Sequence, residues 1–239
     1  MSSLRIGTSG WVYKHWRDIF YPPKEPERSW LEFYAQHFDT VEINFSFYRL
    51  PAEKTFAGWR QRTPAGFRFA VKGSRYITHV KRLDVERESI DRLAERVDAL
   101  EDRAGPVLWQ LPPEFRRDDG RLKAFLDLLP PRYRHTLELR HHSWLVEPVF
   151  DLLQRHGVAL CIPDRSDLPK ELRLTANWTY VRFHSGAEGG DYTSRQLDQW
   201  AAYIGDFLAK GADVWAYFNN DWGGYAIRNA SSLKERLVR

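Results

Sequence analysis

The sequence predicts a TIM-type (β/α)8 barrel in which a single domain spans residues 1–239. Strand-like and helix-like segments alternate along the whole chain, in about eight units with short connections. Several strand-like segments alternate apolar with charged residues, as expected where one face packs on helices and the other faces a barrel lumen. A doubly wound open sheet competes, but the loop GTSGW after the first strand lacks the GxGxxG spacing typical of that fold.

The expected strands are short segments rich in apolar and β-branched residues. In one of them, HTLELRHHSW, the apolar Leu137 and Leu139 alternate with Glu138 and Arg140, two opposite charges on the other face. The expected strands are 4–11, 40–48, 67–73, 106–115, the start of 135–144, 158–164, 178–186 and 213–221.

Helical stripes of apolar residues lie between these strands. Ser29 is expected to cap the first helix and Ser194 a later one, while Asp84 opens a long charged helix. The segment 165–177 contains Pro169 and lacks a helical stripe, so the sixth helix of the barrel is expected to be stunted. Further helices are expected around 53–62, 120–130, 146–156 and from the last strand to about 237.

Composition places the chain among ordinary globular proteins, with 43% hydrophobic and 28% charged residues. The formal net charge of +4 is compatible with an anionic ligand but is no nucleic-acid signature. Cys161 is the single cysteine, which excludes an internal disulfide and fits a reducing cytoplasm. The strand pattern begins by Leu4, and no apolar run approaches the roughly 20 residues that span a bilayer. We therefore expect a soluble cytoplasmic protein without a membrane partner.

Polar side chains recur on the inner face near the C-terminal ends of the strands, where barrels of this kind carry their active sites. Burying an ion costs several kcal/mol unless it is paired or used, so the pattern indicates a site for a polar ligand. An internal salt-bridge network is the structural alternative. The inward set is Glu42, Asn44, Lys72, Gln110, Glu138, Arg140, Arg182, His184 and Asn220, with Asp164 at the end of its own strand.

Loop and rim residues complete the candidate site. Thr8 and Ser9 lie in the Gly/Ser/Thr loop into which the first strand runs within 4–11, where exposed N–H groups can hold a small anion. Asn219 and Asn220 end the last strand, just before two glycines that open the final helix. Aromatic residues are expected around the rim, where they would stack a ring or a base: Trp11, Tyr48, Trp144 and Trp222.

Three mechanisms fit this set. In the first, the cations bind a phosphate or carboxylate and Glu42 or Glu138 transfers protons, with Lys72 and His184 as further catalytic candidates. In the second, a divalent metal lies on His184, Glu42, Glu138 and Asp164. The absence of an HExxH spacing and the nearby Lys and Arg residues disfavour a metal, so no cofactor is assigned. In the third, Lys72 forms a Schiff base, although carboxylate neighbours would favour its charged, non-nucleophilic form.

Seven ordered motifs resemble the YecE-like family, a domain of unknown function (DUF72): GTSGWVYKHW, FDTVEINFSFYRLP, FRFAVKGSRYITH, LWQLPPEF, LELRHHSW, YVRFHSG and YFNND. The resemblance spans almost the whole chain and implies a TIM-type barrel, but it supplies no reaction. Similarity to the barrels of endonuclease IV and xylose isomerase is an analogy of fold only. Their rich metal-ligand set is not matched here, because His184 is the single histidine expected at a strand end beside the carboxylates.

The leading expectation is an enzyme, a hydrolase or an isomerase or lyase, that binds a small or nucleotide-like anion. Glu42 and Glu138 would transfer protons, and Lys72, Arg140 and Arg182 would supply positive charge. An endonuclease IV-like protein that binds or processes nucleic acid is the first alternative, with rim aromatics that stack bases. A non-catalytic metabolite-binding module is the second. The oligomeric state is left open.

Overall fold

The strands form a parallel, eight-stranded sheet that curls into a barrel in the computed structural model, which describes residues 2–187 and 189–238. The order in the sheet is β1-β8-β7-β6-β5-β4-β3-β2. The predicted (β/α)8 barrel is therefore confirmed. The strands are β1 (Leu4–Thr8), β2 (Thr40–Ile43), β3 (Arg68–Lys72), β4 (Ala104–Gln110), β5 (His135–Glu138), β6 (Ala159–Asp164), β7 (Trp178–Phe183) and β8 (Asp213–Phe218).

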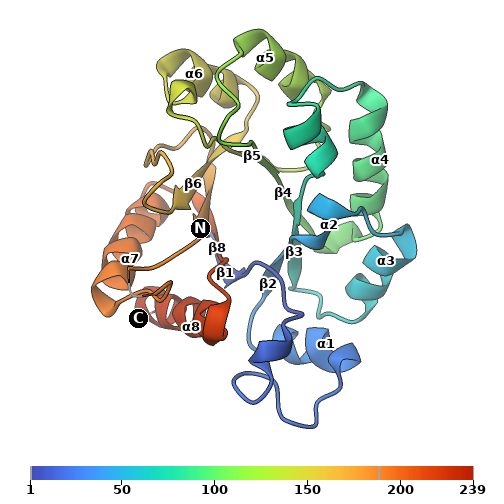
Figure 1. The fold of residues 1–239 in the computed structure, drawn as a ribbon, viewed down its shortest axis with the longest axis vertical. Helices are drawn as coiled ribbons and strands as arrows, with labels where there is room; N and C mark the ends of the chain where they lie inside the picture. Colours follow the sequence, from blue (N-terminus) through green and yellow to red (C-terminus); the bar gives the residue numbers. More distant parts are fainter. Residues whose placement is uncertain (1, 188, 239) are drawn as a thin grey trace.

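Helices surround the strands on the outside of the barrel (Figure 1). Residues 165–177, between β6 and β7, contain no helix, so the stunted sixth helix is confirmed. Within the described ranges, none of the helices is long and apolar enough to cross a membrane. The α-helices are α1 (Trp30–Ala35), α2 (Phe45–Tyr48), α3 (Glu53–Gln61), α4 (Arg87–Asp98), α5 (Asp119–Leu128), α6 (Glu147–Arg155), α7 (Ser194–Ala209) and α8 (Tyr225–Leu237).

Several short helices complete the loops. They are η1 (Lys14–Trp16), η2 (Glu27–Ser29), the π-helix η3 (Tyr76–Val80), η4 (Glu101–Arg103), η5 (His142–Trp144) and η6 (Trp222–Gly224).

Some local expectations differ from the structure. The strand expected to run to Tyr48 ends at Ile43, because the chain turns into α2. Ser29 precedes α1 but makes no side-chain cap. The cap of α7 is Thr193, whose side chain forms a reciprocal capping box with Gln196, so Ser194 is the first helical residue. The charged helix α4 begins three residues after the expected Asp84, at Arg87.

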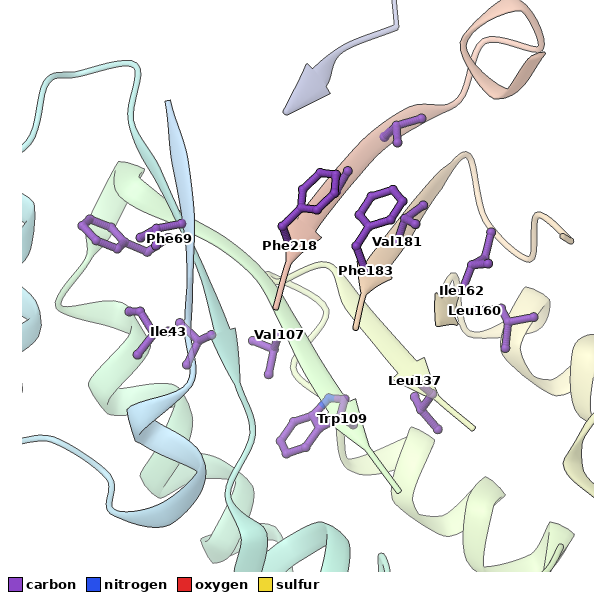
Figure 2. Close-up of a cluster of buried hydrophobic side chains, with 14 of the residues drawn as sticks. Ile43, Phe69, Val107, Trp109, Leu137, Leu160, Ile162, Val181, Phe183 and Phe218 are labelled. Atoms are coloured by element: carbon purple, nitrogen blue, oxygen red, sulfur yellow. The ribbon is translucent and has the colours of Figure 1, made fainter. Parts of the chain in front are cut away.

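Outward-facing strand residues pack against the helices and form the main hydrophobic core. Figure 2 shows part of this layer, including Phe69 on β3, Trp109 on β4 and Phe183 on β7. Phe183 stacks on Phe218 of β8, with the ring centroids 4.1 Å apart. Because apolar residues occupy these outer faces, the alternate polar residues of the same strands face the lumen.

A second apolar cluster fills the lower part of the lumen. Trp178 and Tyr180 precede Arg182 on the same face of β7, so the charged side chains lie on the C-terminal side of this cluster. The barrel is thus a packed core that carries its polar residues at one end. The cluster consists of Ala70, Leu108, Ala159, Cys161, Trp178, Tyr180, Trp215 and Tyr217.

The barrel closes between β1 and β2 by an unusual seam. Among the described residues, these two strands share one isolated backbone bridge, between Ser9 and Glu42, in place of a ladder. The buried Tyr34 hydroxyl of α1 spans the gap: it accepts a hydrogen bond from the Thr8 amide at 2.9 Å and donates one to the Thr40 carbonyl at 3.0 Å. One side chain thereby satisfies two backbone groups that a ladder would otherwise pair.

Replacing Tyr34 by phenylalanine is expected to lower the free energy of unfolding by about 1–3 kcal/mol, because it leaves a buried N–H and a buried carbonyl unpaired. Denaturation by urea measures this loss. Tyr203→Phe is the matched control, since the Tyr203 hydroxyl accepts a surface hydrogen bond from Gln199 within α7. Equal stability of the two variants would show that the Tyr34 hydroxyl does not bridge the seam.

Candidate functional site

Charged and polar side chains from six strands meet at the C-terminal end of the lumen. Alternation along each strand brings them inward, as Tyr180, Arg182 and His184 show for β7 and the residues that follow it. The structure brings together these residues of the predicted set: Ser9, Glu42, Lys72, Gln110, Glu138, Arg140, Arg182 and His184.

Glu42 is fully buried and holds Arg182 in a fixed position. Its two oxygens accept hydrogen bonds from Arg182 Nε at 3.0 Å and Nη2 at 2.8 Å. Ser9 Oγ donates at 2.6 Å and the Tyr180 hydroxyl at 2.7 Å. Four donors therefore saturate this carboxylate, in the bidentate geometry that suits a guanidinium.

Glu138 is the second buried carboxylate, on the other side of Arg182. It accepts hydrogen bonds from Arg182 Nη1 at 2.8 Å, Arg140 Nε at 2.6 Å and Gln110 Nε2 at 2.9 Å. His184 Nε2 lies 3.4 Å from Glu138 Oε1, beyond normal hydrogen-bond length. Arg182 is thus sandwiched between two glutamates, and Arg140 pairs with the second of them.

These contacts disfavour the predicted role of the two glutamates in proton transfer. Burial alone would raise the pKa of Glu42, but Arg182 and the hydrogen bonds outweigh it and hold that pKa below its ordinary value. At Glu138, burial also acts to raise the pKa, but Arg182 and Arg140 outweigh it and hold this pKa well below its ordinary value. Both carboxylates stay ionised at neutral pH, so they act as the charged frame of the site.

Lys72 is the charged residue of the cluster that the two glutamates do not pair. It is the last residue of β3 and is 8% exposed, and its Nζ lies 4.3 Å from the centre of the Phe47 ring. Within the described part of the chain, Lys72 forms no ion pair with a carboxylate. Burial and the nearby Arg182 lower the pKa of Lys72 to about 7, against the opposing pull of Glu42 and Glu138. This amine is therefore partly neutral at physiological pH.

Arg140 presents the second set of free donors. Its Nε bonds to Glu138, whereas its two terminal nitrogens make no hydrogen bond to any residue that the structure describes. The side chain is 15% exposed, so these nitrogens are accessible from the mouth of the barrel. A guanidinium edge left free in this way suits a phosphate or carboxylate.

Two buried polar atoms at the mouth also have no hydrogen-bond partner among the described residues: Asn44 Oδ1 and His184 Nε2. Asn44 and His184 both contact Asn219, at 3.4 Å and 3.3 Å. Burial lowers the pKa of His184, so its ring is neutral at pH 7. Buried polar atoms are normally paired, which makes these two candidates for contact with a ligand.

Sequence reasoning missed His79, Phe47, Tyr180 and Cys161. His79 packs edge-on against Phe47, with ring centroids 4.9 Å apart, and burial together with Lys72 and Arg140 lowers its pKa to about 4. It lies on the π-helix η3, where no strand alternation could reveal it. Tyr180 and Cys161 do share the inward face of their strands, so the same alternation would have found them.

Strand parity excludes two predicted residues from the lumen. Asp164 and Asn220 follow inward-facing neighbours and therefore point outward. Asp164 bonds to Lys170 and to Trp200 of α7, and Asn220 bonds to Asn229 of α8. These two residues hold the barrel to its helices.

Three further placements concern the rim. Thr8 points away from the lumen, and its hydroxyl donates to the Gly10 carbonyl. Trp144 is fully buried and donates to the Phe115 carbonyl, so its predicted place on the rim is wrong. Trp222 is 78% exposed near the end of β8.

Trp11 and Tyr48 line a cavity of about 390 Å3 beside the mouth. Its other walls include Tyr13, Trp59 and Asn44, so it adjoins the charged site through Asn44. The Tyr13 hydroxyl donates to the Ser9 carbonyl at 2.6 Å. This arrangement offers flat apolar surface beside Asn44.

Of the four predicted metal ligands, Glu42, Glu138 and His184 lie in one cluster, whereas Asp164 points outward and bonds to Trp200. Hydrogen-bond donors, Arg182 among them, already saturate Glu42 and Glu138. Within residues 2–187 and 189–238, no group of three or more His, Cys, Asp or Glu residues is arranged to hold a metal ion.

Replacing Lys72 by methionine is expected to stabilise the protein most at and below pH 7, because it removes a buried cation. The unfolded chain keeps its lysine protonated up to the ordinary pKa of 10.5, whereas the folded protein releases that proton near pH 7. Wild-type stability therefore rises relative to the variant above pH 7, by about 1.4 kcal/mol per pH unit. Urea denaturation from pH 6 to pH 9 measures the difference.

Lys210→Met is the control for this prediction, since Lys210 forms a surface pair with Asp206. Its effect should be small and constant over the same pH range. A wild-type minus Lys72→Met difference that does not change with pH would contradict the assigned protonation.

Comparison with known proteins places the chain among uncharacterised relatives. The family model described as "Protein of unknown function DUF72" matches residues 5–239. The UPF0759 protein YunF of Bacillus subtilis is 27% identical over 272 residues, covering 98% of this chain and 94% of YunF. The UPF0759 protein YecE of Escherichia coli is 36% identical over 118 residues, covering 49% of this chain and 43% of YecE. The predicted resemblance to YecE-like proteins is therefore confirmed.

Solved structures agree with the fold. A DUF72 family protein from Thermotoga maritima is 26% identical, with a TM-score of 0.89 and coverage of 99% of this chain and 100% of that chain. D-psicose 3-epimerase from Clostridium cellulolyticum is 11% identical, with a TM-score of 0.57 and 98% of both chains covered. The second similarity concerns the fold alone.

Proposed function

The chain belongs to the DUF72 family of proteins of unknown function, and we propose that it is an enzyme for a small substrate bearing a phosphate or carboxylate. The observation that carries this proposal is the separation of paired from unpaired charges. Glu42 and Glu138 are paired with arginine, while Lys72 and the terminal nitrogens of Arg140 keep free donors at the mouth.

A small anion fits this site better than a neutral ligand does. It would accept hydrogen bonds from the Arg140 guanidinium and an ammonium at Lys72, which are stronger than bonds between neutral groups. Asn44 Oδ1, which lacks a partner among the described residues, adds an acceptor for a hydroxyl on the same ligand. Both cations lie at the C-terminal ends of strands, where the reactions of such barrels take place.

Catalysis is supported by a group that can exchange protons near neutral pH. The buried carboxylates stay ionised, so we assign the reactive group to Lys72, whose pKa is lowered to about 7 by burial and Arg182 and whose amine is therefore partly neutral. Glu42 and Glu138 then have an indirect role: they fix Arg182 and Arg140 in place.

Calorimetric titration with inorganic phosphate, pyruvate and ribose 5-phosphate tests the binding step. Arg140→Gln is expected to weaken binding by about tenfold or more, the loss of one charge-assisted hydrogen bond. Arg132→Gln is the control, because Arg132 pairs with Asp98 on the outside of the barrel. Equal affinities for the two variants, or no binding of any small anion by the wild type, would overturn the proposal.

A nucleic-acid ligand is the second candidate, supported by exposed aromatic rings at the rim. Phe45, Tyr48 and Trp222 are each more than half exposed, and a groove beside Phe45 is lined by Arg49, Arg92 and Arg96. Contacts to several phosphates make affinity fall steeply with salt, whereas one small anion does not. Tight, strongly salt-dependent binding of a duplex with an abasic site, without binding of small anions, would favour this candidate.

A further inference from the structure

We propose that Lys72 acts as a nucleophile and forms an imine with a substrate that carries both an anionic group and an aldehyde or ketone. This inference rests on the proposed function, because Arg140 must first hold the anionic group. The substrate class is therefore narrower than small anions in general: 2-oxo acids and phosphorylated aldehydes or ketones.

The hydrogen-bond network leaves the amine available. A lysine beside two glutamates would ordinarily be held as an ammonium by an ion pair, which abolishes its nucleophilicity. Here Glu42 takes two bonds from Arg182, and Glu138 takes bonds from Arg182 and Arg140. Lys72 instead faces the ring of Phe47, with its Nζ 4.3 Å from the ring centre.

The surroundings also favour the neutral amine. Buried lysines lose their proton more easily, and a neighbouring cation adds to this effect. Arg182 and Arg140 lie close enough to lower the pKa of Lys72, and Glu42 and Glu138 oppose them without reversing the result. Burial, together with Lys72 and Arg140, lowers the pKa of the nearby His79 to about 4, so its ring is neutral at pH 7.

The chemistry needs no redox partner. The lone pair of Nζ attacks the carbonyl carbon, and the carbonyl π electrons move to its oxygen. Two protons from the nitrogen pass to that oxygen, which leaves as water, and a carbon–nitrogen double bond remains. Once its nitrogen takes up a proton from solvent, the imine withdraws electrons from the adjacent carbon, so it would activate the substrate for proton loss or carbon–carbon cleavage.

Reductive trapping tests the inference. The wild-type protein is incubated at pH 7.5 with pyruvate or with glyceraldehyde 3-phosphate and sodium cyanoborohydride, followed by intact mass measurement and peptide mapping. We expect one adduct at Lys72, formed at least about tenfold faster than at exposed lysines such as Lys210, because burial lowers the pKa of Lys72 to about 7 and leaves much of its amine neutral at this pH. Trapping at Lys72 should rise with pH around a midpoint of about 7.

Two variants make the outcomes distinct. Lys72→Met should abolish the fast adduct, and Arg140→Gln should slow it while Lys72 remains present. Labelling of Lys72 no faster than of Lys210, in a protein whose anion binding still depends on Arg140, would overturn the imine and leave the proposed function standing. If neither pyruvate nor glyceraldehyde 3-phosphate bound, both the imine and the proposed function would be overturned.

Discussion

Replacing Arg182 by methionine is expected to lower the free energy of unfolding by about 3–5 kcal/mol near neutral pH, because it leaves buried carboxylates without their shared cation. Arg182, Glu42 and Glu138 are all 0% exposed, and Arg182 is the shared partner of both carboxylates. Gln110 and Arg140 still pair with Glu138 in the variant, so most of the loss falls on Glu42. Urea denaturation followed by tryptophan fluorescence measures it.

The pH dependence identifies the cause. In the wild type, the lowered pKa values of Glu42 and Glu138 contribute stability above the ordinary carboxyl range, and this contribution is lost as the pH falls through the folded values. Without Arg182, burial should raise the pKa of Glu42, so the penalty should shrink as the pH falls and the carboxyl binds a proton.

Two comparisons complete this test. Arg132→Met removes a surface pair with Asp98 and should cost at most about 1 kcal/mol. Adding Glu42→Gln to Arg182→Met should recover part of the stability, because it removes the buried carboxylate that has lost its cation. A loss no larger than that of Arg132→Met would mean that the buried pairs do not frame the site.

Replacing Gly7 by alanine is expected to destabilise the barrel by about 3 kcal/mol, because there is no room for a methyl group at the seam between β1 and β2. A Cβ at Gly7 would lie 2.2 Å from the Thr40 carbonyl oxygen and 3.0 Å from the Tyr34 hydroxyl. The Thr40 oxygen is backbone and cannot turn aside, so the two strands must separate. Thermal and urea denaturation report the loss.

The same substitution at Gly58 is the control. Gly58 lies within α3, where a Cβ would meet nothing within 4 Å. Gly58→Ala should therefore be stabilising by up to about 1 kcal/mol, through the better helix propensity of alanine. If Gly7→Ala matched Gly58→Ala, the close approach of β1 and β2 would not be required for the fold.

Alternation along the strands made much of the site predictable. Side chains of a strand point to opposite faces in turn, so Glu42, Lys72, Glu138 and Arg182 could be assigned to one lumen from their apolar neighbours. The distribution of hydrogen bonds among them was not predictable. Which carboxylate pairs with which cation depends on strand register, which the sequence pattern does not contain.

Positions at or beyond strand ends were predicted less well. Side chains alternate between the two faces of a strand, which places Asp164 and Asn220 on the outward face. Their polar character and their position at strand ends suggested the opposite. Tyr48 looked like the end of a strand because its segment is aromatic, and tertiary context makes it helical. His79 reaches the site from a π-helix, so its contact with Phe47 follows from loop geometry alone.

Anomalous diffraction from crystals soaked in selenate tests most directly whether Lys72 and Arg140 form an anion site. Selenate has the shape and charge of phosphate and sulfate, and its selenium is located without ambiguity. We predict a selenium peak between Arg140 and Lys72 in the wild type, with selenate oxygens within hydrogen-bond distance of Arg140 Nη and Lys72 Nζ, and the loss of this peak in Arg140→Gln. Selenate bound at surface arginines alone, with these two nitrogens unoccupied, would contradict the account.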